Sequence, residues 1–128
     1  MSFSNYLETK ILDHVFAGTA YTAPATKYLA LFTAAPGEAG GGTEVSTSGT
    51  AYARQSVAFT TSGNTTSNSA AVEFPTATAS YGTVTYVGVF DASTGGNLMA
   101  YAALSSSKTI DSGDVFRVPA GDLDISLD

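Results

Sequence analysis

The chain has 128 residues, no cysteine and a formal net charge of −6, with only five Lys or Arg residues. This length fits one domain that can bury a core. The lack of cysteine excludes disulfides and thiolate metal sites, and the scarcity of basic residues argues against a nucleic-acid-binding surface. No apolar run is long enough to predict a membrane span, and the N-terminus lacks the pattern of a signal peptide. We therefore expect a single domain over residues 1–128 that binds neither nucleic acid nor membrane.

Residues 4–17 predict the one helix of the chain. Ser4 or Asn5 can act as the N-cap, and Gly18 is a suitable stop. One face carries an apolar stripe of Leu7, Ile11, Leu12, Val15 and Phe16. We expect this stripe to lie on a sheet or on a neighbouring subunit. His14, the only histidine, lies beside the stripe and is interpreted as a polar boundary residue rather than a catalyst.

Short strand-like runs separated by turn residues fill residues 27–128. The polar stretch Thr61–Asn68 predicts a turn between two of them. The predicted strands are Lys27–Thr33, Tyr52–Thr60, Ala70–Phe74, Val84–Phe90, Leu98–Leu104, Val115–Val118 and Leu123–Leu127. Seven short strands without alternating helices favour a mainly β fold, either an antiparallel β-sandwich or a jelly-roll-like barrel, with one N-terminal α-helix.

The stretch Val84–Leu104 predicts a central pair of strands joined by the loop Asp91–Asn97. Both strands are apolar on both faces, so both faces must be covered. Strict alternation places Val84, Tyr86 and Phe90 on one face, with Val87 and Val89 on the other. We expect a second layer of this chain to cover one face and another subunit to cover the other.

Two other strands alternate more regularly. In Tyr52–Thr60 one face is expected to carry Ala53, Val57 and Phe59, and the opposite face Tyr52, Arg54, Ser56 and Thr60. In the last strand Leu123, Ile125 and Leu127 are expected to point inward, with aspartates and Ser126 outward. This alternation predicts that the last residues are built into a sheet.

The segment Gly37–Thr50 contains three consecutive glycines and is long for a loop of a small domain. A phosphate-binding loop is rejected, because the GxxxxGK[ST] pattern is absent and no helix follows. Two interpretations stay open: a flexible arm that reaches toward a neighbouring molecule, or a plain surface loop.

The residues predict no catalytic, cofactor or metal site. A Ser/His/Asp set would need His14, and no nucleophile-elbow motif is present. The paired carboxylates near the C-terminus, Asp111 with Asp114 and Asp122 with Asp124 and Asp128, are interpreted as turn caps and a solvated sheet face. The alternative is a hard-cation site at Asp122 and Asp124, which share a face of the strand. We therefore expect that the protein is not an enzyme and uses no cofactor.

Several pieces cover nearly the whole chain: SNYLETKILDHVFAGTAYTAPATKYLALFTAAP, GGGTEV, YARQSV, VEFPTATASYGTVTYVGVFDASTGGNL and the closing SGD and AGDLDISLD. Together they resemble a family of small bacteriophage virion structural proteins. Members are often labelled tail fibre proteins, and other proteins of this size and style are capsid decoration proteins. The resemblance implies a virion protein that is made in the host cytoplasm and carries no catalytic motif.

The resemblance leaves two functions open. The leading expectation is a capsid decoration, or cement, protein that binds the assembled shell. The alternative is a tail fibre or tail-tip component involved in host attachment. The expected partners are copies of the chain itself, with a trimer among the expected oligomers, and the major capsid protein or tail proteins of the phage.

Overall fold

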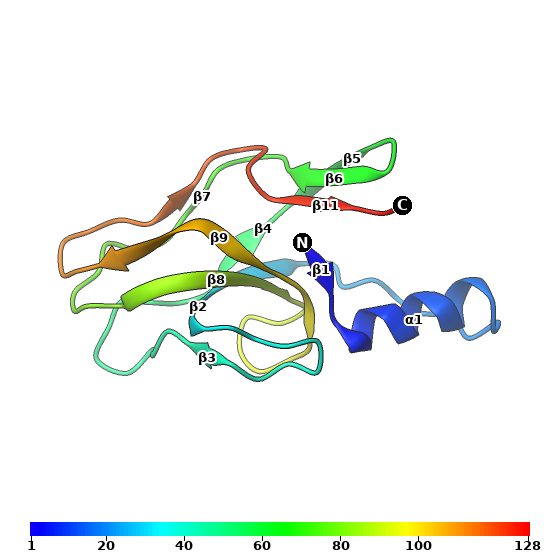
Figure 1. The fold of residues 1–128 in the computed structure, drawn as a ribbon, viewed down its shortest axis with the longest axis horizontal. Helices are drawn as coiled ribbons and strands as arrows, with labels where there is room; N and C mark the ends of the chain where they lie inside the picture. Colours follow the sequence, from blue (N-terminus) through cyan, green and yellow to red (C-terminus); the bar gives the residue numbers. More distant parts are fainter.

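A computed structural model describes residues 1–128 and confirms a mainly β fold with one N-terminal helix. Figure 1 shows a main antiparallel sheet, smaller strand groups above it, and helix α1 (Asn5–Val15) extending away from both. The main sheet has the order β1-β9-β8-β2-β3, and β4 also pairs with β2. Its strands are β1 (Ser2–Phe3), β2 (Lys27–Ala34), β3 (Thr43–Glu44), β4 (Gln55–Val57), β8 (Gly82–Phe90) and β9 (Leu98–Ile110).

The second layer consists of two small antiparallel groups. One contains β5 (Phe59–Ser62), β6 (Thr65–Asn68) and β11 (Asp124–Ser126), and the other contains β7 (Val72–Glu73) and β10 (Arg117–Val118). The sheets do not close on one another, so the sandwich expectation is confirmed and the barrel alternative is not. No helix of the protein is long and apolar enough to span a membrane.

One hydrophobic core of 17 buried residues links these layers. Leu29, Leu31 and the valines of β8 contribute from the main sheet. Aromatic rings fill the middle: Tyr52 stacks on Phe74 with ring centres 6.0 Å apart, and Phe74 meets Phe116 edge-on at 5.9 Å. Burial of these side chains is the main driving force for this fold.

The predicted central hairpin is confirmed, but strict alternation along β8 is not. Val84 pairs with Lys108, whereas Tyr86 pairs with Ala103, so residues 104–107 of β9 bulge opposite Thr85. A bulge re-aims the side chains that flank it. Val84 therefore lies in the same core as Val87 and Val89, instead of sharing a face with Tyr86 and Phe90 as predicted.

Two more predictions from residue patterns are wrong. The expected polar turn Thr61–Asn68 is a hairpin, because threonines favour strands and Gly63 (φ 61°) with Asn64 forms a two-residue turn. The run Tyr52–Thr60 is divided between β4 and β5, and Tyr52 is buried rather than on a polar face.

One strand boundary, one additional strand and one face also differ from the predictions. β9 continues to Ile110, and the hydroxyls of Thr83 and Thr109 are hydrogen-bonded across the pair at 3.0 Å. β1 is an additional strand that pairs with β9. In the last strand Leu123 is buried as predicted, but Leu127 is 53% exposed.

The segment Gly37–Thr50 does not project as a free arm. β3 pairs with β2, the side chain of Val45 is buried, and the Asn5 N–H donates to the Glu38 carbonyl oxygen at 2.9 Å. Gly42 lies so close to the backbone of Ala34 that a β-carbon there would be 2.7 Å from the carbonyl oxygen. The glycines thus allow this segment to fold back over the main sheet.

Candidate interaction surfaces

The start of helix α1 is fixed to the main sheet by one serine. The hydroxyl of Ser4 accepts from the Leu7 N–H at 3.3 Å, which caps the helix, and donates to the Leu98 carbonyl oxygen at 2.5 Å. Of the two predicted N-caps, Ser4 is therefore the one used. The helix ends in a turn at Gly18 (φ 73°), across which the Thr19 N–H donates to the Asp13 carbonyl oxygen at 3.0 Å.

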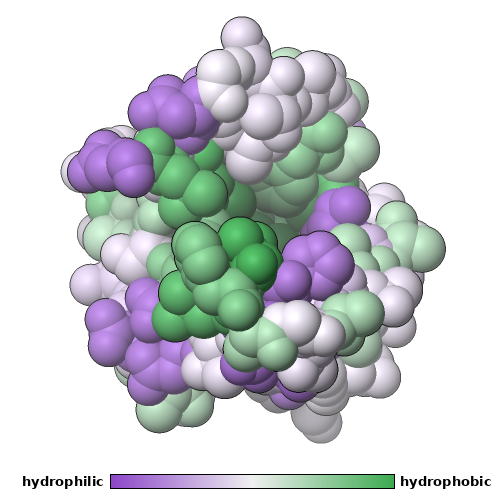
Figure 2. All heavy atoms as spheres, turned by 90° about the vertical axis from the view of Figure 1, so that its right-hand side faces the viewer, coloured by the Kyte–Doolittle hydropathy of each residue, from purple (hydrophilic) through white to green (hydrophobic).

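The far end of α1 carries an exposed apolar surface. Leu12 is 58% exposed, Val15 60% and Phe16 81%, and no residue of the helix is fully buried. Figure 2 views the molecule from this end and shows apolar atoms gathered at its centre, beside a hollowed region. Only Leu7 of the predicted stripe packs against the core. The stripe therefore does not lie along the sheet, and its far half has no cover within this chain.

The remaining contacts of α1 hold the segment that returns from it. Nδ1 of His14 accepts a hydrogen bond from the Tyr21 N–H at 3.0 Å. The rings of Tyr6 and Tyr21 meet edge-on with centres 6.5 Å apart, and the Lys10 ammonium lies 5.7 Å from the centre of the Tyr6 ring. These contacts place the only histidine in a structural role at the helix flank.

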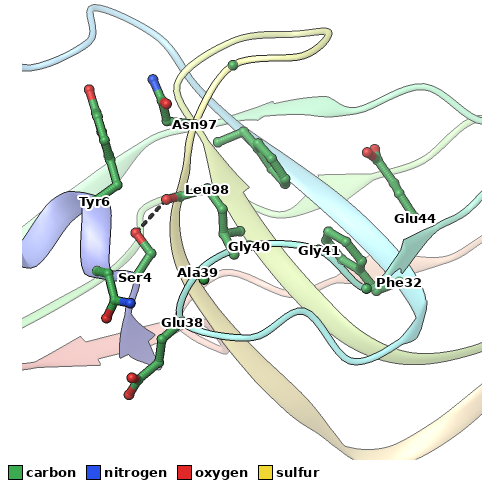
Figure 3. Close-up of a pocket in the computed structure, with 14 residues that line it drawn as sticks. Ser4, Tyr6, Phe32, Glu38, Ala39, Gly40, Gly41, Glu44, Asn97 and Leu98 are labelled. Carbon is green, nitrogen blue, oxygen red and sulfur yellow. Dashed lines mark hydrogen bonds between the residues drawn. The ribbon is translucent and has the colours of Figure 1, made fainter.

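A hollow of about 510 Å³ lies on the outer face of the main sheet, between the start of α1, the loop over residues 37–42 and the Asp91–Asn97 loop. Figure 3 shows Tyr6, Glu38 and Asn97 around its rim and the glycine backbone on one side. The loop covers part of the outer face that we expected another subunit to cover. The hollow is wide open and is lined by both apolar and polar groups, which suits a contact surface better than a reaction site.

Two stacked phenylalanines form the floor of this hollow. The rings of Phe32 and Phe90 are 6.1 Å apart and nearly parallel. Gly88 lies beneath them, since a β-carbon there would be 2.8 Å from Leu98 and 3.0 Å from Phe32. The apolar outer face predicted from the sequence is thus packed by residues of the same chain at this end.

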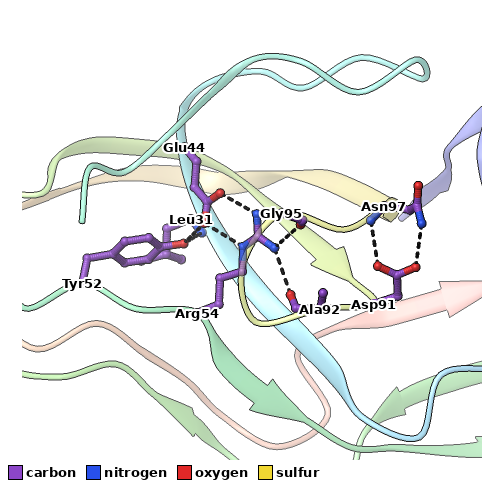
Figure 4. Close-up of polar contacts among 8 residues, drawn as sticks. All are labelled: Leu31, Glu44, Tyr52, Arg54, Asp91, Ala92, Gly95 and Asn97. Atoms are coloured by element: carbon purple, nitrogen blue, oxygen red, sulfur yellow. Dashed lines mark hydrogen bonds and ion pairs between the residues drawn. The ribbon is translucent and has the colours of Figure 1, made fainter. Parts of the chain in front are cut away.

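Arg54 ties the loops around the hollow together, as Figure 4 shows. Its guanidinium makes a bidentate pair with Glu44, with Nε–Oε2 at 2.9 Å and Nη2–Oε1 at 2.8 Å. Nη1 donates to the carbonyl oxygens of Ala92 at 2.9 Å and Gly95 at 2.8 Å. The guanidinium also lies over the ring of Phe90, at 3.7 Å. We call these contacts the Arg54 cluster.

Tyr52 joins this cluster from the core side. Its hydroxyl donates to Glu44 Oε2 at 2.6 Å and accepts from the Leu31 N–H at 3.1 Å. Leu31 lies on β2 between the residues that pair with β4 and those that pair with β3. At this gap between β4 and β3, the hydroxyl thus accepts the backbone hydrogen bond that a neighbouring strand would otherwise accept from β2. Burial raises the pKa of the Tyr52 hydroxyl far above its ordinary value, and the hydrogen bond to Glu44 raises it further.

The Asp91–Asn97 loop is closed by its two end residues. The Asp91 carboxylate accepts from the Asn97 N–H at 2.7 Å and from its side-chain amide at 2.9 Å. Gly96 (φ 73°) approaches Asp91 so closely that a side chain there would clash. This loop presents its carbonyl groups to Arg54 because its ends are held in this way.

The C-terminal aspartates lie at turns and on an exposed strand. The carboxylate of Asp114 accepts from the Asp111 N–H at 2.9 Å, and that of Asp124 accepts from the Ser67 hydroxyl. The side chains of Asp122 and Asp128 are exposed. Nowhere do three His, Asp or Glu side chains gather as a set of metal ligands. The arrangement matches the turn-cap interpretation of Asp111 and Asp114.

Sequence reasoning missed the Arg54 cluster. Alternation puts Arg54 on the face opposite Val57 and Phe59, and Glu44 falls in the segment Gly37–Thr50, which is expected to be a loop or an arm. One signal is available: the chain has only five basic residues, so an arginine within a strand-like run, close in sequence to Glu38 and Glu44, is a candidate for a buried ion pair.

Comparison with known protein families gives a match. The family model described as "Podophage GP4 fiber I protein gp80" matches residues 2–126. A search among curated proteins gives no match. The match extends from β1 to β11 and thus includes α1, the outer-face hollow and the Arg54 cluster.

Proposed function

The chain belongs to the family of the podophage GP4 fibre I protein and is a bacteriophage virion structural protein, and from this premise we propose that it is a component of a tail fibre or tail tip. The single observation that carries the proposal is the family match, which spans nearly the whole chain. The description of that family names a fibre, so it supports our alternative from the sequence better than the leading expectation of a capsid decoration protein.

The shape of the domain supports a globular fibre module rather than a shaft. The longest strand has 13 residues and the helix has 11. A strand of that length spans roughly 40 Å, and neither element extends into a repeating rod. The apolar far end of α1 projects from this body, as an anchoring element of such a module would.

The role we propose is structural rather than catalytic. The only histidine accepts a backbone hydrogen bond from Tyr21, and the largest hollow is lined mainly by glycines, apolar side chains and carboxylates. Binding energy on assembly would come from covering apolar surface, which is the usual source of affinity at protein interfaces.

A cryo-EM map of the virion tests the location. Maps of wild-type virions are compared with maps of virions from a phage that lacks the gene for this chain. The domain is then fitted into the difference density. We expect the difference density on the tail. Difference density confined to the capsid shell would overturn the fibre proposal and favour decoration of the capsid. Adsorption of the two particle types to host cells then measures whether the module contributes to host attachment.

A further inference from the structure

A second hollow, of about 390 Å³, lies on another side of the molecule, between β9, β10 and the start of β11. It is the most apolar of the larger hollows, because several residues of the core line it beside the bulge at residues 104–107. Its apolar lining includes Val87, Ala102, Leu104, Phe116, Val118 and Leu123. We call it the β9–β10 hollow.

The rim of the β9–β10 hollow differs in charge from the rest of the chain. Lys108 and Arg117, two of the five basic residues, lie on it together with Asp122 and Asp124. Positive and negative side chains therefore balance here, although the whole chain carries a net charge of −6. An acidic apolar element meets less repulsion at this rim than elsewhere on the surface.

The far end of α1 is such an element. Leu12, Val15 and Phe16 form its apolar part, and Asp13 lies between them with the carbonyl groups of the helix C-terminus nearby. That terminus carries partial negative charge. The helix extends away from the sheets (Figure 1), and its main contacts with strands, to β1 and β9, include the Ser4–Leu98 hydrogen bond at its start, while His14 binds only the segment that returns from the helix. Its far end is therefore positioned for a neighbouring molecule.

We infer that the far end of α1 inserts into the β9–β10 hollow of a second copy of this chain. The apolar side chains enter the hollow, and Asp13 faces Lys108 and Arg117 at its rim. The two surfaces are different, so the contact is head-to-tail, and repetition of it closes a ring of a few copies when the rotation permits. Each copy in a ring makes the contact twice. This inference does not depend on where in the virion the protein is placed.

Sedimentation velocity of the purified full chain over a concentration series tests the inference. The wild-type chain is expected to associate as its concentration rises, into a closed ring where the rotation permits. The helix-end variant Leu12→Gln/Phe16→Gln is expected to associate at least roughly tenfold more weakly, since a few buried side chains dominate such contacts. Leu127→Gln, at an apolar residue of similar exposure, is the matched control and keeps the oligomer. A wild-type chain that stays monomeric throughout overturns the inference.

The hollow is tested by filling it. Ser106 lines the β9–β10 hollow and Ser107, beside it in the same bulge, does not. Ser106→Trp is expected to abolish the oligomer, and Ser107→Trp is expected to keep it. Both positions are exposed, and circular dichroism with thermal unfolding confirms that each variant is folded. An oligomer that survives Ser106→Trp overturns the inference and points to contact between helices instead.

Mixing the two defective variants gives the sharpest outcome. The helix-end variant retains an intact hollow, and Ser106→Trp retains an intact helix end, so the mixture is expected to form a one-to-one complex and nothing larger. A mixture that stays monomeric overturns the head-to-tail contact. Asp13→Lys mixed with Lys108→Glu/Arg117→Glu provides a second test that leaves the apolar residues unchanged: each variant alone associates more weakly, and the mixture regains association.

Discussion

The guanidinium carbon of Arg54 lies 3.7 Å from the centre of the Phe90 ring. A cation this close to an aromatic face contributes more interaction free energy when it has little access to water than when it is exposed. The contact is also a structural link, because Phe90 is the last residue of β8 and Arg54 directly precedes β4. The two residues join opposite sides of β2 across the outer face of the sheet.

Replacing Arg54 is therefore expected to destabilise the fold. Arg54→Lys keeps the charge but loses the bidentate pair and the planar contact with Phe90, at a cost of about 2 kcal/mol. Arg54→Ala leaves Glu44 without its partner and costs about 3 kcal/mol or more. Urea unfolding measures both. Arg117→Lys, at an exposed arginine, should change the free energy of unfolding by less than about 0.5 kcal/mol; an equal effect at both positions would contradict the role given to Arg54.

Removal of one hydroxyl should weaken the edge of the main sheet. Tyr52→Phe leaves the buried Leu31 N–H without an acceptor and takes a donor from Glu44, which is expected to cost about 1–3 kcal/mol. The measurement is urea unfolding, combined with hydrogen exchange of the Leu31 amide, which should become faster. Tyr101→Phe, at a half-buried tyrosine of β9 away from this gap, is the matched control and should leave both quantities nearly unchanged.

Stability should fall at alkaline pH. The folded-state pKa of Tyr52 is raised, first by burial, and burial also raises the pKa values of Tyr21 and Tyr81. The folded chain then binds more protons than the unfolded chain above the ordinary tyrosine pKa of 10.0. The contribution of these groups is fully present below that pH and is lost as the pH rises above it. Urea unfolding between neutral pH and pH values above 10 measures the loss.

The Tyr52→Phe variant separates this effect from general alkaline denaturation. Without the Tyr52 hydroxyl, the free energy of unfolding should fall less steeply with pH in the alkaline range, although it starts from a lower value. Equal slopes for the variant and the wild type would show that Tyr52 does not carry the pH dependence.

A methyl group added at Gly88 should be poorly tolerated. The new β-carbon would be 2.8 Å from Leu98 and 3.0 Å from Phe32, so the stacked phenylalanines must shift. Gly88→Ala is expected to cost about 1–3 kcal/mol, as overpacking does in other cores. Gly37→Ala is the control, because its added β-carbon would meet only ordinary contact distances. Thermal unfolding of the two variants should differ in midpoint; similar midpoints would mean that the outer face repacks freely.

Local signals in the sequence are sufficient to predict the helix, whose cap is Ser4, and the hairpin Val84–Leu104, whose loop closes through Asp91 and Asn97. They do not predict the position of a residue whose conformation depends on a partner distant in the sequence. Tyr52 looks like a polar-face residue in its own strand, and only its contacts with Leu31 and Glu44 draw it into the core.

The position of Val84 shows the same limit. The bulge that turns it toward the core lies on β9, a different strand. The pattern of alternation along β8 alone therefore cannot reveal this bulge. The exposed end of α1 was predicted as an apolar stripe, but whether such a stripe covers a sheet or projects from it depends on how the first turn is attached, here through Ser4 and Leu98.

The Arg54 cluster has a consequence for where this protein can work. It joins four segments through hydrogen bonds, one ion pair and one aromatic contact, in a chain without any cysteine. Small secreted domains commonly rely on disulfides for such links. A virion moves between a reducing cell interior and an oxidising exterior. The contacts of the Arg54 guanidinium are changed by neither thiols nor oxidants. The domain can thus keep one shape in a reducing and in an oxidising environment without any redox chemistry.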